Sequence, residues 1–154
     1  LVSRGGGRFV ARPTSVGNPV TISVSAKGRK IGEYKFRVRR LPDPAPYIAM
    51  GGDRFKSGSL SKAALMSASG IHAAIDDGLL DIPFTVTSFR TVFFDNMGNA
   101  VPLASNGSQF SAQQKEQFRH LSRNKRFYIT NVIVHGPDGT TRTLNGRNME
   151  VIVQ

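Results

Sequence analysis

The residue types that most often carry chemistry are present in this chain but scattered. His72, His120 and His135 are far apart in the sequence, and none lies in a metal-binding motif. Asp76 and Asp77 are neighbours, so on a strand their carboxylates would point to opposite sides rather than converge on one proton. Because a glycine follows them, a turn is the better interpretation. The histidines and carboxylates therefore predict neither a catalytic site nor a metal site.

Motifs for nucleophiles and phosphate binding are also missing. No serine lies in a Gly-x-Ser-x-Gly turn, and the glycines at 5–7 and 51–52 lack the Lys-Ser/Thr of a phosphate-binding loop. The chain has no cysteine, which excludes disulfides and cysteine-ligated zinc. Its longest apolar runs are far shorter than the roughly 20 residues that cross a bilayer, so no membrane contact is expected. We expect a protein that is not an enzyme and that needs no cofactor.

Positive charge is concentrated at one end of the chain. The 154 residues include 21 Lys or Arg and 10 Asp or Glu, which gives a formal net charge of +11. Residues 1–41 hold ten of these cations and a single acid, Glu33, whereas cations and acids nearly balance in residues 42–154. A segment of this kind suggests an anionic partner, either a nucleic acid or an acidic protein surface.

The stretch around Arg40 divides the chain. Up to Arg40, apolar and cationic residues alternate, as on a strand with one buried face and one charged face. Three prolines in five positions follow, which removes backbone donors and favours a stiff, extended joint. We interpret residues 42–46 as a proline-rich connector between residues 1–41 and residues 47–154. The candidate residues for an interaction or for the domain joint are Arg37, Arg39, Arg40, Pro42, Pro44 and Pro46.

Two interpretations of the cationic strand stay open. Arg37, Arg39 and Arg40 could line a phosphate-binding strip on which Tyr34 or Phe36 stacks with bases, which would make the chain a basic nucleic-acid-binding module. The aromatic residues alternate with the cations, however, so they are expected to point the other way and to pack in a core. No recognised RNA- or DNA-binding signature is present. The leading interpretation is a charged strand face, either solvated or docked to an acidic protein, with no nucleic acid expected.

The pattern before the prolines predicts a β-hairpin. Residues 20–25 and 31–40 alternate like half-buried strands on either side of a turn. Two or three strands with one apolar face are only marginally stable alone. We expect them to complete a sandwich with strands that lie either upstream in the sequence or in a second copy of the chain, which would make a homodimer.

The pattern after the prolines predicts a β-rich α+β domain, so the whole chain is mainly β with two short α-helices. Ser59 and Ser61 are N-cap candidates for a helix that ends before Gly70. Ser111 and Gln114 have the spacing of a capping box, which predicts a second helix. Residues 136–139 give the strongest turn signal. The predicted strands are residues 83–94, 127–134, 140–144 and 149–153.

Several of these motifs, in this order, resemble the C-terminal region of the GldM/PorM family. They are Phe-Arg-Val-Arg-Arg-Leu-Pro-Asp-Pro at 36–44, Gly-Gly at 51–52, Ser-Leu-Ser-Lys at 59–62, Val-Thr-Ser-Phe at 86–89 and Gly-Pro-Asp-Gly-Thr at 136–140. The resemblance covers nearly the whole chain and is greater to the PorM-like members.

The resemblance implies a part in the type IX secretion system and gliding motility of Bacteroidetes. Members of the family are anchored in the inner membrane by an N-terminal transmembrane helix, absent from this sequence, which pairs with a PorL/GldL-type motor partner. A dimeric periplasmic shaft then reaches a ring of PorK/PorN (GldK/GldN)-type proteins. On this mapping, residues 1–41 are the closing strands of a penultimate immunoglobulin-like domain, and residues 47–154 form the last domain. The chain would be a periplasmic, non-enzymatic assembly module.

Overall fold

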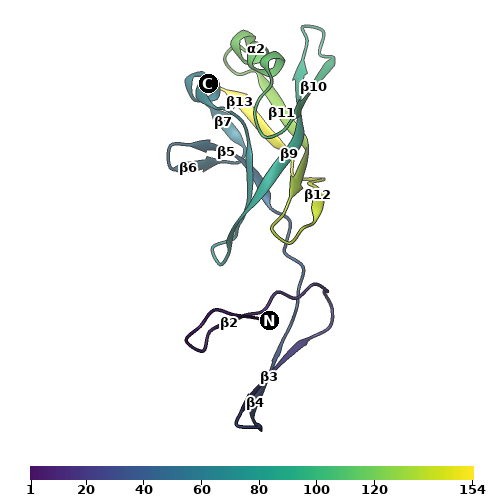
Figure 1. The fold of residues 1–154 in the computed structure, drawn as a ribbon. Helices are drawn as coiled ribbons and strands as arrows, with labels where there is room; N and C mark the ends of the chain where they lie inside the picture. Colours follow the sequence, from purple (N-terminus) through teal and green to yellow (C-terminus); the bar gives the residue numbers. More distant parts are fainter. The chain divides into compact units, whose positions relative to one another are not determined.

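The chain folds as two structural units that adjoin in sequence between Leu41 and Pro42. The structure, a computed structural model, describes residues 1–154, with Leu1–Leu41 as the first unit and Pro42–Gln154 as the second. Figure 1 shows short paired strands in the first unit, and a larger sheet with two helices in the second. This content confirms the predicted fold class, which is mainly β with two short helices. The immunoglobulin-like assignment of the first unit stays a prediction.

The first unit is built on a β-hairpin. Strand β3 (Val20–Ala26) pairs antiparallel with β4 (Arg29–Phe36) across a tight turn. A shorter antiparallel pair joins β1 (Val2–Ser3) to β2 (Phe9–Val10). The alternating sequence produces the longer hairpin, because its valine, isoleucine and aromatic side chains collect on one face.

One expectation for this hairpin is wrong. Strand β4 ends at Phe36 rather than at Arg40, because its last pair is with Val20, and the residue before Val20 is a proline without a backbone N–H. The cationic residues that follow Phe36 therefore lie in a segment outside the sheet. Tyr34 and Phe36 are 57% and 54% exposed in this chain. The core expected around them includes strands from upstream or from a second copy, so that expectation stays a prediction.

A single sheet organises the second unit. Its strand order is β6-β5-β8-β9-β11-β13-β7, with β10 also paired to β9 and β12 also paired to β11. Only the pairing of β13 with β7 is parallel. The strands are β5 (Ala45–Met50), β6 (Asp53–Phe55), β7 (Gly58–Leu60), β8 (His72–Asp76), β9 (Asp81–Phe94), β10 (Ala100–Asn106), β11 (Arg126–His135), β12 (Thr141–Thr143) and β13 (Met149–Val153).

The last two prolines of the predicted connector belong to the second unit. Pro44 and Pro46 are buried, and Pro46 lies in β5, where it pairs with β8. The sheet tolerates Pro46 because β6 pairs only with Ile48–Met50, so a single side of Pro46 faces a paired strand. Strand β5 begins at Ala45, so the predicted connector of residues 42–46 and the predicted domain start at residue 47 differ from the structure.

Both helices of the second unit begin at a side-chain cap. Helix α1 (Lys62–Ser67) has Ser61 as its N-cap. Helix α2 (Ala112–His120) begins with the predicted capping box, in which the Ser111 and Gln114 side chains accept from each other's backbone N–H groups. These local contacts satisfy backbone donors that would otherwise be left without partners at the helix starts.

An aromatic cluster attaches helix α2 to one face of the sheet. The ring of Phe118 in α2 lies 5.9 Å from the ring of Phe93 and 5.2 Å from that of Phe127, measured between centroids. Phe110 lies 4.9 Å from Phe118 on its other side. All four rings are buried, and each contributes on the order of 2–3 kcal/mol through removal of apolar surface from water. The core of the second unit is centred here.

Candidate functional site

The arginines predicted to form an interaction surface lie together in the first unit. Arg37, Arg39 and Arg40 are all exposed, and none of them makes an ion pair. They line a hollow of about 510 Å³ whose walls also include Val16 and Pro19. Guanidinium groups stay protonated in proteins, so this surface can attract an anion but cannot transfer a proton.

A buried arginine that the sequence did not single out holds the first residues of the second unit. The Arg142 side chain, on β12, is only 3% exposed. Its Nη1 atom donates to the carbonyl oxygen of Pro42 at 2.9 Å and to Oδ1 of Asp43 at 3.1 Å. Its Nη2 atom donates to Oδ2 of Asp138 at 2.8 Å, and its Nε atom to the hydroxyl of Thr140 at 3.1 Å. We call these five residues the Arg142 cluster.

The turn before β12 places the acid of the Arg142 cluster. Oδ1 of Asp138 accepts from the backbone N–H of Thr140 at 3.1 Å and from its hydroxyl at 2.7 Å. The turn itself is closed by a bond from the N–H of Gly136 to the carbonyl oxygen of Thr140 at 2.9 Å. The pKa of Asp138 lies below its ordinary value, mainly because the carboxylate accepts a hydrogen bond from the Thr140 hydroxyl. The backbone N–H of Thr140 and the guanidinium of Arg142 lower this pKa further.

An aromatic ring shields the guanidinium of Arg142 from water. The Cζ atom of Arg142 lies 5.4 Å from the centroid of the Phe84 ring. Gly136 is needed at this point, because a Cβ atom there would come within 2.5 Å of a Phe84 ring carbon. Removal of water strengthens the charge-assisted bonds that the guanidinium makes.

The Arg142 cluster can hold and orient a segment of chain, because its Pro42 carbonyl and both of its carboxylates are bound by one buried guanidinium, and one carboxylate also by its neighbour Thr140. The bonds from Arg142 to Pro42 and Asp43 join residues that are 100 and 99 positions apart in sequence. Strand β12 pairs in turn with β11, which also pairs with β9 and β13. The cluster therefore connects the first residues of the second unit to the centre of its sheet.

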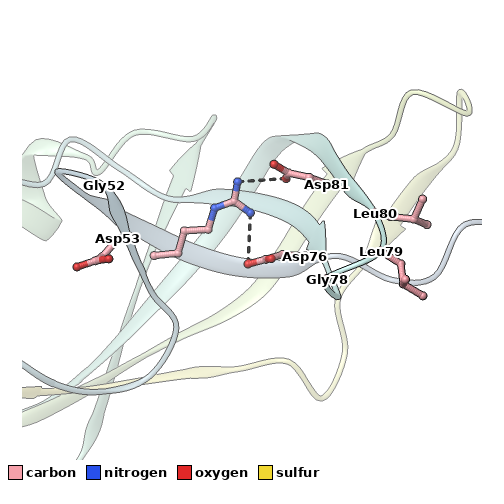
Figure 2. Close-up of a pocket in the computed structure, with 8 residues that line it drawn as sticks. Gly52, Asp53, Asp76, Gly78, Leu79, Leu80 and Asp81 are labelled. Carbon is pink, nitrogen blue, oxygen red and sulfur yellow. Dashed lines mark hydrogen bonds and ion pairs between the residues drawn. The ribbon is translucent and has the colours of Figure 1, made fainter.

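A hollow of about 390 Å³ beside β6 also contains charged residues. The Arg54 guanidinium lies 3.4 Å from the carboxylate of Asp76 and 3.2 Å from that of Asp81. Figure 2 shows these two carboxylates in the hollow, while Leu79 and Leu80 point away from them. The predicted turn after β8 is present here. Asp53 also lines the hollow, but Asp76 and Asp81 both pair with Arg54, so the hollow has no two unpaired carboxylates.

The histidines lie in three different places of the second unit. The His72 ring stacks on Tyr47, His120 is hydrogen-bonded to Glu116, and His135 is hydrogen-bonded to Thr141. No three histidine or acidic residues are close enough together to hold a metal ion. None of the helices has the length and apolar character needed to cross a membrane.

Sequence reasoning missed the Arg142 cluster although one local signal was available. Side chains alternate between two faces along β12, so Arg142 lies on the same face as Leu144, the buried residue directly after this strand. A cation on the apolar face of a strand predicts a buried anionic or carbonyl partner. The partners themselves, Pro42 and Asp43, lie too far away in the sequence for any local pattern to indicate them.

Two family models match this chain and together cover nearly all of it. The model described as the GldM C-terminal domain matches residues 42–154, and the model described as the GldM third domain matches residues 1–39. The chain belongs to the GldM family. The resemblance to GldM/PorM proteins that its motifs suggested is thereby confirmed. No curated protein matches the chain significantly.

Membership of the GldM family gives the chain a general role. The family is a component of gliding motility and type IX secretion, and it is a structural component rather than a known enzyme family. GldM proteins are membrane-anchored and carry periplasmic C-terminal domains. The Arg142 cluster lies wholly within the GldM C-terminal domain, whereas Arg37 and Arg39 lie within the GldM third domain.

Proposed function

We propose that this chain is a non-enzymatic, periplasmic structural module at the distal end of a dimeric GldM shaft. In this role it couples an inner-membrane motor of the PorL/GldL type to a ring of PorK/PorN (GldK/GldN)-type proteins associated with the outer membrane. The observation that carries the proposal is the Arg142 cluster, because it braces the first residues of a GldM C-terminal domain against the sheet of that domain.

The bracing suits a part that transmits force. A load that arrives along the chain at Pro42 meets a carbonyl bonded to a buried guanidinium, so β12 shares the load. Charge-assisted hydrogen bonds in a water-poor site are among the stronger polar contacts in proteins. The buried Pro44 and Pro46 limit local movement further, because proline fixes its own φ angle. These features favour a domain that moves as one body over one that unravels from its first residue.

The remaining sites support a structural rather than a catalytic role. Of the three carboxylates that line the hollow beside β6, Asp76 and Asp81 are bound by Arg54, which leaves Asp53 alone. General acid/base catalysis needs a group that can gain and lose a proton near neutral pH within reach of a substrate. The contacts in this hollow provide charge pairing instead.

The apolar face of the β3–β4 hairpin supports a homodimer or a larger third domain. Ile22 pairs with Tyr34 and Val20 pairs with Phe36 on this face, which stays largely exposed. A two-stranded hairpin with such a face needs further strands to cover it. Those strands belong, in our proposal, to the third domain of the shaft or to its second copy.

A direct binding measurement tests the proposed function. The purified chain is titrated with the PorN/GldN-type ring protein of the same organism by isothermal titration calorimetry, with a PorL/GldL-type periplasmic segment as the negative partner. We expect saturable binding to the ring protein alone. Absence of binding at protein concentrations of about 100 μM, where even weak periplasmic complexes are detected, would refute the proposed role.

Nucleic-acid binding is a second candidate function because Arg37, Arg39 and Arg40 are exposed and free of ion pairs. A salt-sensitive gel shift with random oligonucleotides would favour this function. Our account predicts no shift that survives physiological salt.

A further inference from the structure

The sheet of the second unit has a face that its helices do not cover. Alternation along β9 sends Phe93 and Thr91 into the core beneath the helices. The same alternation leaves Arg90, Val92 and Phe94 on the opposite face, where Phe94 is 46% exposed. A large aromatic side chain is thus presented to solvent on a strand that is otherwise central to the sheet.

The strand register extends this face across β11 and β13. Tyr128 of β11 lies opposite Val92, and Glu150 of β13 lies opposite Tyr128. Residues that lie opposite each other in a ladder share a face, so these side chains belong together. We call the following six residues the open face: Arg90, Val92, Phe94, Arg126, Tyr128 and Glu150.

Side chains of the open face are already held in place. The rings of Phe94 and Tyr128 meet edge to face, with centroids 6.0 Å apart. The hydroxyl of Tyr128 donates to Oε1 of Glu150 at 3.2 Å, and Nη1 of Arg126 donates to the same oxygen at 2.8 Å. Ordered side chains lose little conformational entropy when a partner binds, and Tyr, Phe and Arg are enriched at protein interfaces.

The charge around the open face is positive. Arg90 is exposed and makes no ion pair. Glu150, the one acid of the open face, is already paired with Arg126. A symmetric dimer through this face would offer Arg90 no unpaired carboxylate, because the only acid that the second copy brings is the Glu150 already bound by Arg126. The charge therefore fits an acidic partner of a different kind.

The edge of the sheet next to the open face is blocked. Strand β10 is the neighbour of β9 here, and Pro102, opposite Val92, lies in the middle of β10. Proline has no N–H to donate to an added strand. A partner at this place is therefore expected to rest on the face of the sheet with a folded surface, and not to extend the sheet.

We propose that the open face is a docking surface for a folded protein that presents carboxylates around an apolar centre. Phe94 and Val92 would pack on that centre, and Arg90 would pair with a carboxylate at its rim. The inference rests on the proposed function, in which this partner is the ring protein.

The experiment compares two double variants of the full chain. Arg90→Glu with Phe94→Ser alters the open face. Lys115→Glu with Met97→Ser is the matched control, because Lys115 of α2 is exposed without an ion pair and Met97 is 87% exposed in the β9–β10 turn. Both variants change the net charge by the same amount, and each removes one exposed apolar side chain.

Affinity for the purified PorN/GldN-type ring protein is the main readout. We expect the open-face variant to bind at least about tenfold more weakly, and the control variant to stay within about twofold of the unchanged chain. Raising the salt concentration from about 0.05 to 0.3 M should weaken binding of the unchanged chain, and should affect the open-face variant much less. Equal urea midpoints of the two variants would show that weaker binding does not come from unfolding. If the midpoint of the open-face double variant falls, the single variant Arg90→Gln takes its place.

Each contrary outcome has a distinct meaning. Equal affinities of the open-face variant and the unchanged chain would overturn the docking surface and leave the proposed function intact. Failure of the unchanged chain to bind the ring protein would remove both. A change in oligomeric state of the open-face variant by light scattering, with unchanged ring binding, would assign the face to a second copy and overturn the inference.

Discussion

Replacement of Arg142 by alanine is the most informative single change in this chain. It removes the donors that reach Pro42, Asp43 and Asp138, together with the guanidinium that lies on the Phe84 ring. No other side chain in the Arg142 cluster can replace these donors. We expect the second unit to keep its fold but to lose a large part of its stability.

The magnitude follows from the contacts of Arg142. A hydrogen bond made by a charged donor contributes about 1.5–3 kcal/mol, and a cation over an aromatic face about 0.5–1 kcal/mol. The ion pair with Asp43 adds little, since that carboxylate is 55% exposed. Breaking a buried pair costs about 3–5 kcal/mol when the partner is left buried, but the Asp138 carboxylate can regain water. We therefore expect Arg142→Ala to lower the unfolding free energy of the second unit by about 3 kcal/mol.

Urea unfolding followed by far-ultraviolet circular dichroism measures this loss. With a slope of about 2 kcal/mol per M, the urea midpoint should fall by about 1.5 M. The control is Arg147→Ala, which removes the same charge from an exposed position between β12 and β13. A midpoint shift for Arg142→Ala no larger than that of Arg147→Ala would refute the reasoning, because the buried contacts would then contribute nothing.

Three further changes test other parts of the fold. Acidification from pH 7 to pH 3 should destabilise the second unit, because folding lowers the pKa of Asp138. The Asp138 carboxylate contributes its full stabilisation above its ordinary pKa. That contribution disappears as the pH falls through the folded-state pKa. Asp138→Asn should flatten the curve of urea midpoint against pH, and parallel curves would contradict this source of acid sensitivity. Phe118→Ala should cost about 3–5 kcal/mol in a thermal or urea melt, since its ring contacts two core rings of the sheet. Ser111→Ala should cost about 1 kcal/mol through loss of the α2 cap, and Ser111→Asp should restore most of that loss.

Features with a local cause could be predicted from the sequence. The capping box of Ser111 and Gln114 fixes the start of α2 within a few residues, and the structure has that start. The Phe-, Val- and Thr-rich residues 83–94 and the turn at 136–139 likewise correspond to β9 and to the turn between β11 and β12. In each case the residues that decide the structure are neighbours in the chain.

Features that depend on distant partners could not be predicted in this way. Three prolines at alternate positions indicate a spacer, yet Pro46 is part of β5, because a paired strand, β8, lies on one side of it only. The end of β4 at Phe36 is set by a proline on the opposite strand. Arg142 looks like an ordinary strand cation until Pro42 and Asp43 are known to lie beside it. The roles of Arg37, Arg39 and Arg40 stay predictions.

Secretion by cells that carry Arg142→Ala in the full-length protein tests the central claim most directly. The variant is expected to accumulate at normal levels and to bind the ring protein, yet to export type IX cargo at a clearly lower rate than the Arg147→Ala control. That combination would separate attachment from coupling through the Arg142 cluster. Normal export by a variant whose C-terminal domain is measurably weakened would contradict the account, because the cluster would then have no part in transmitting force to the ring.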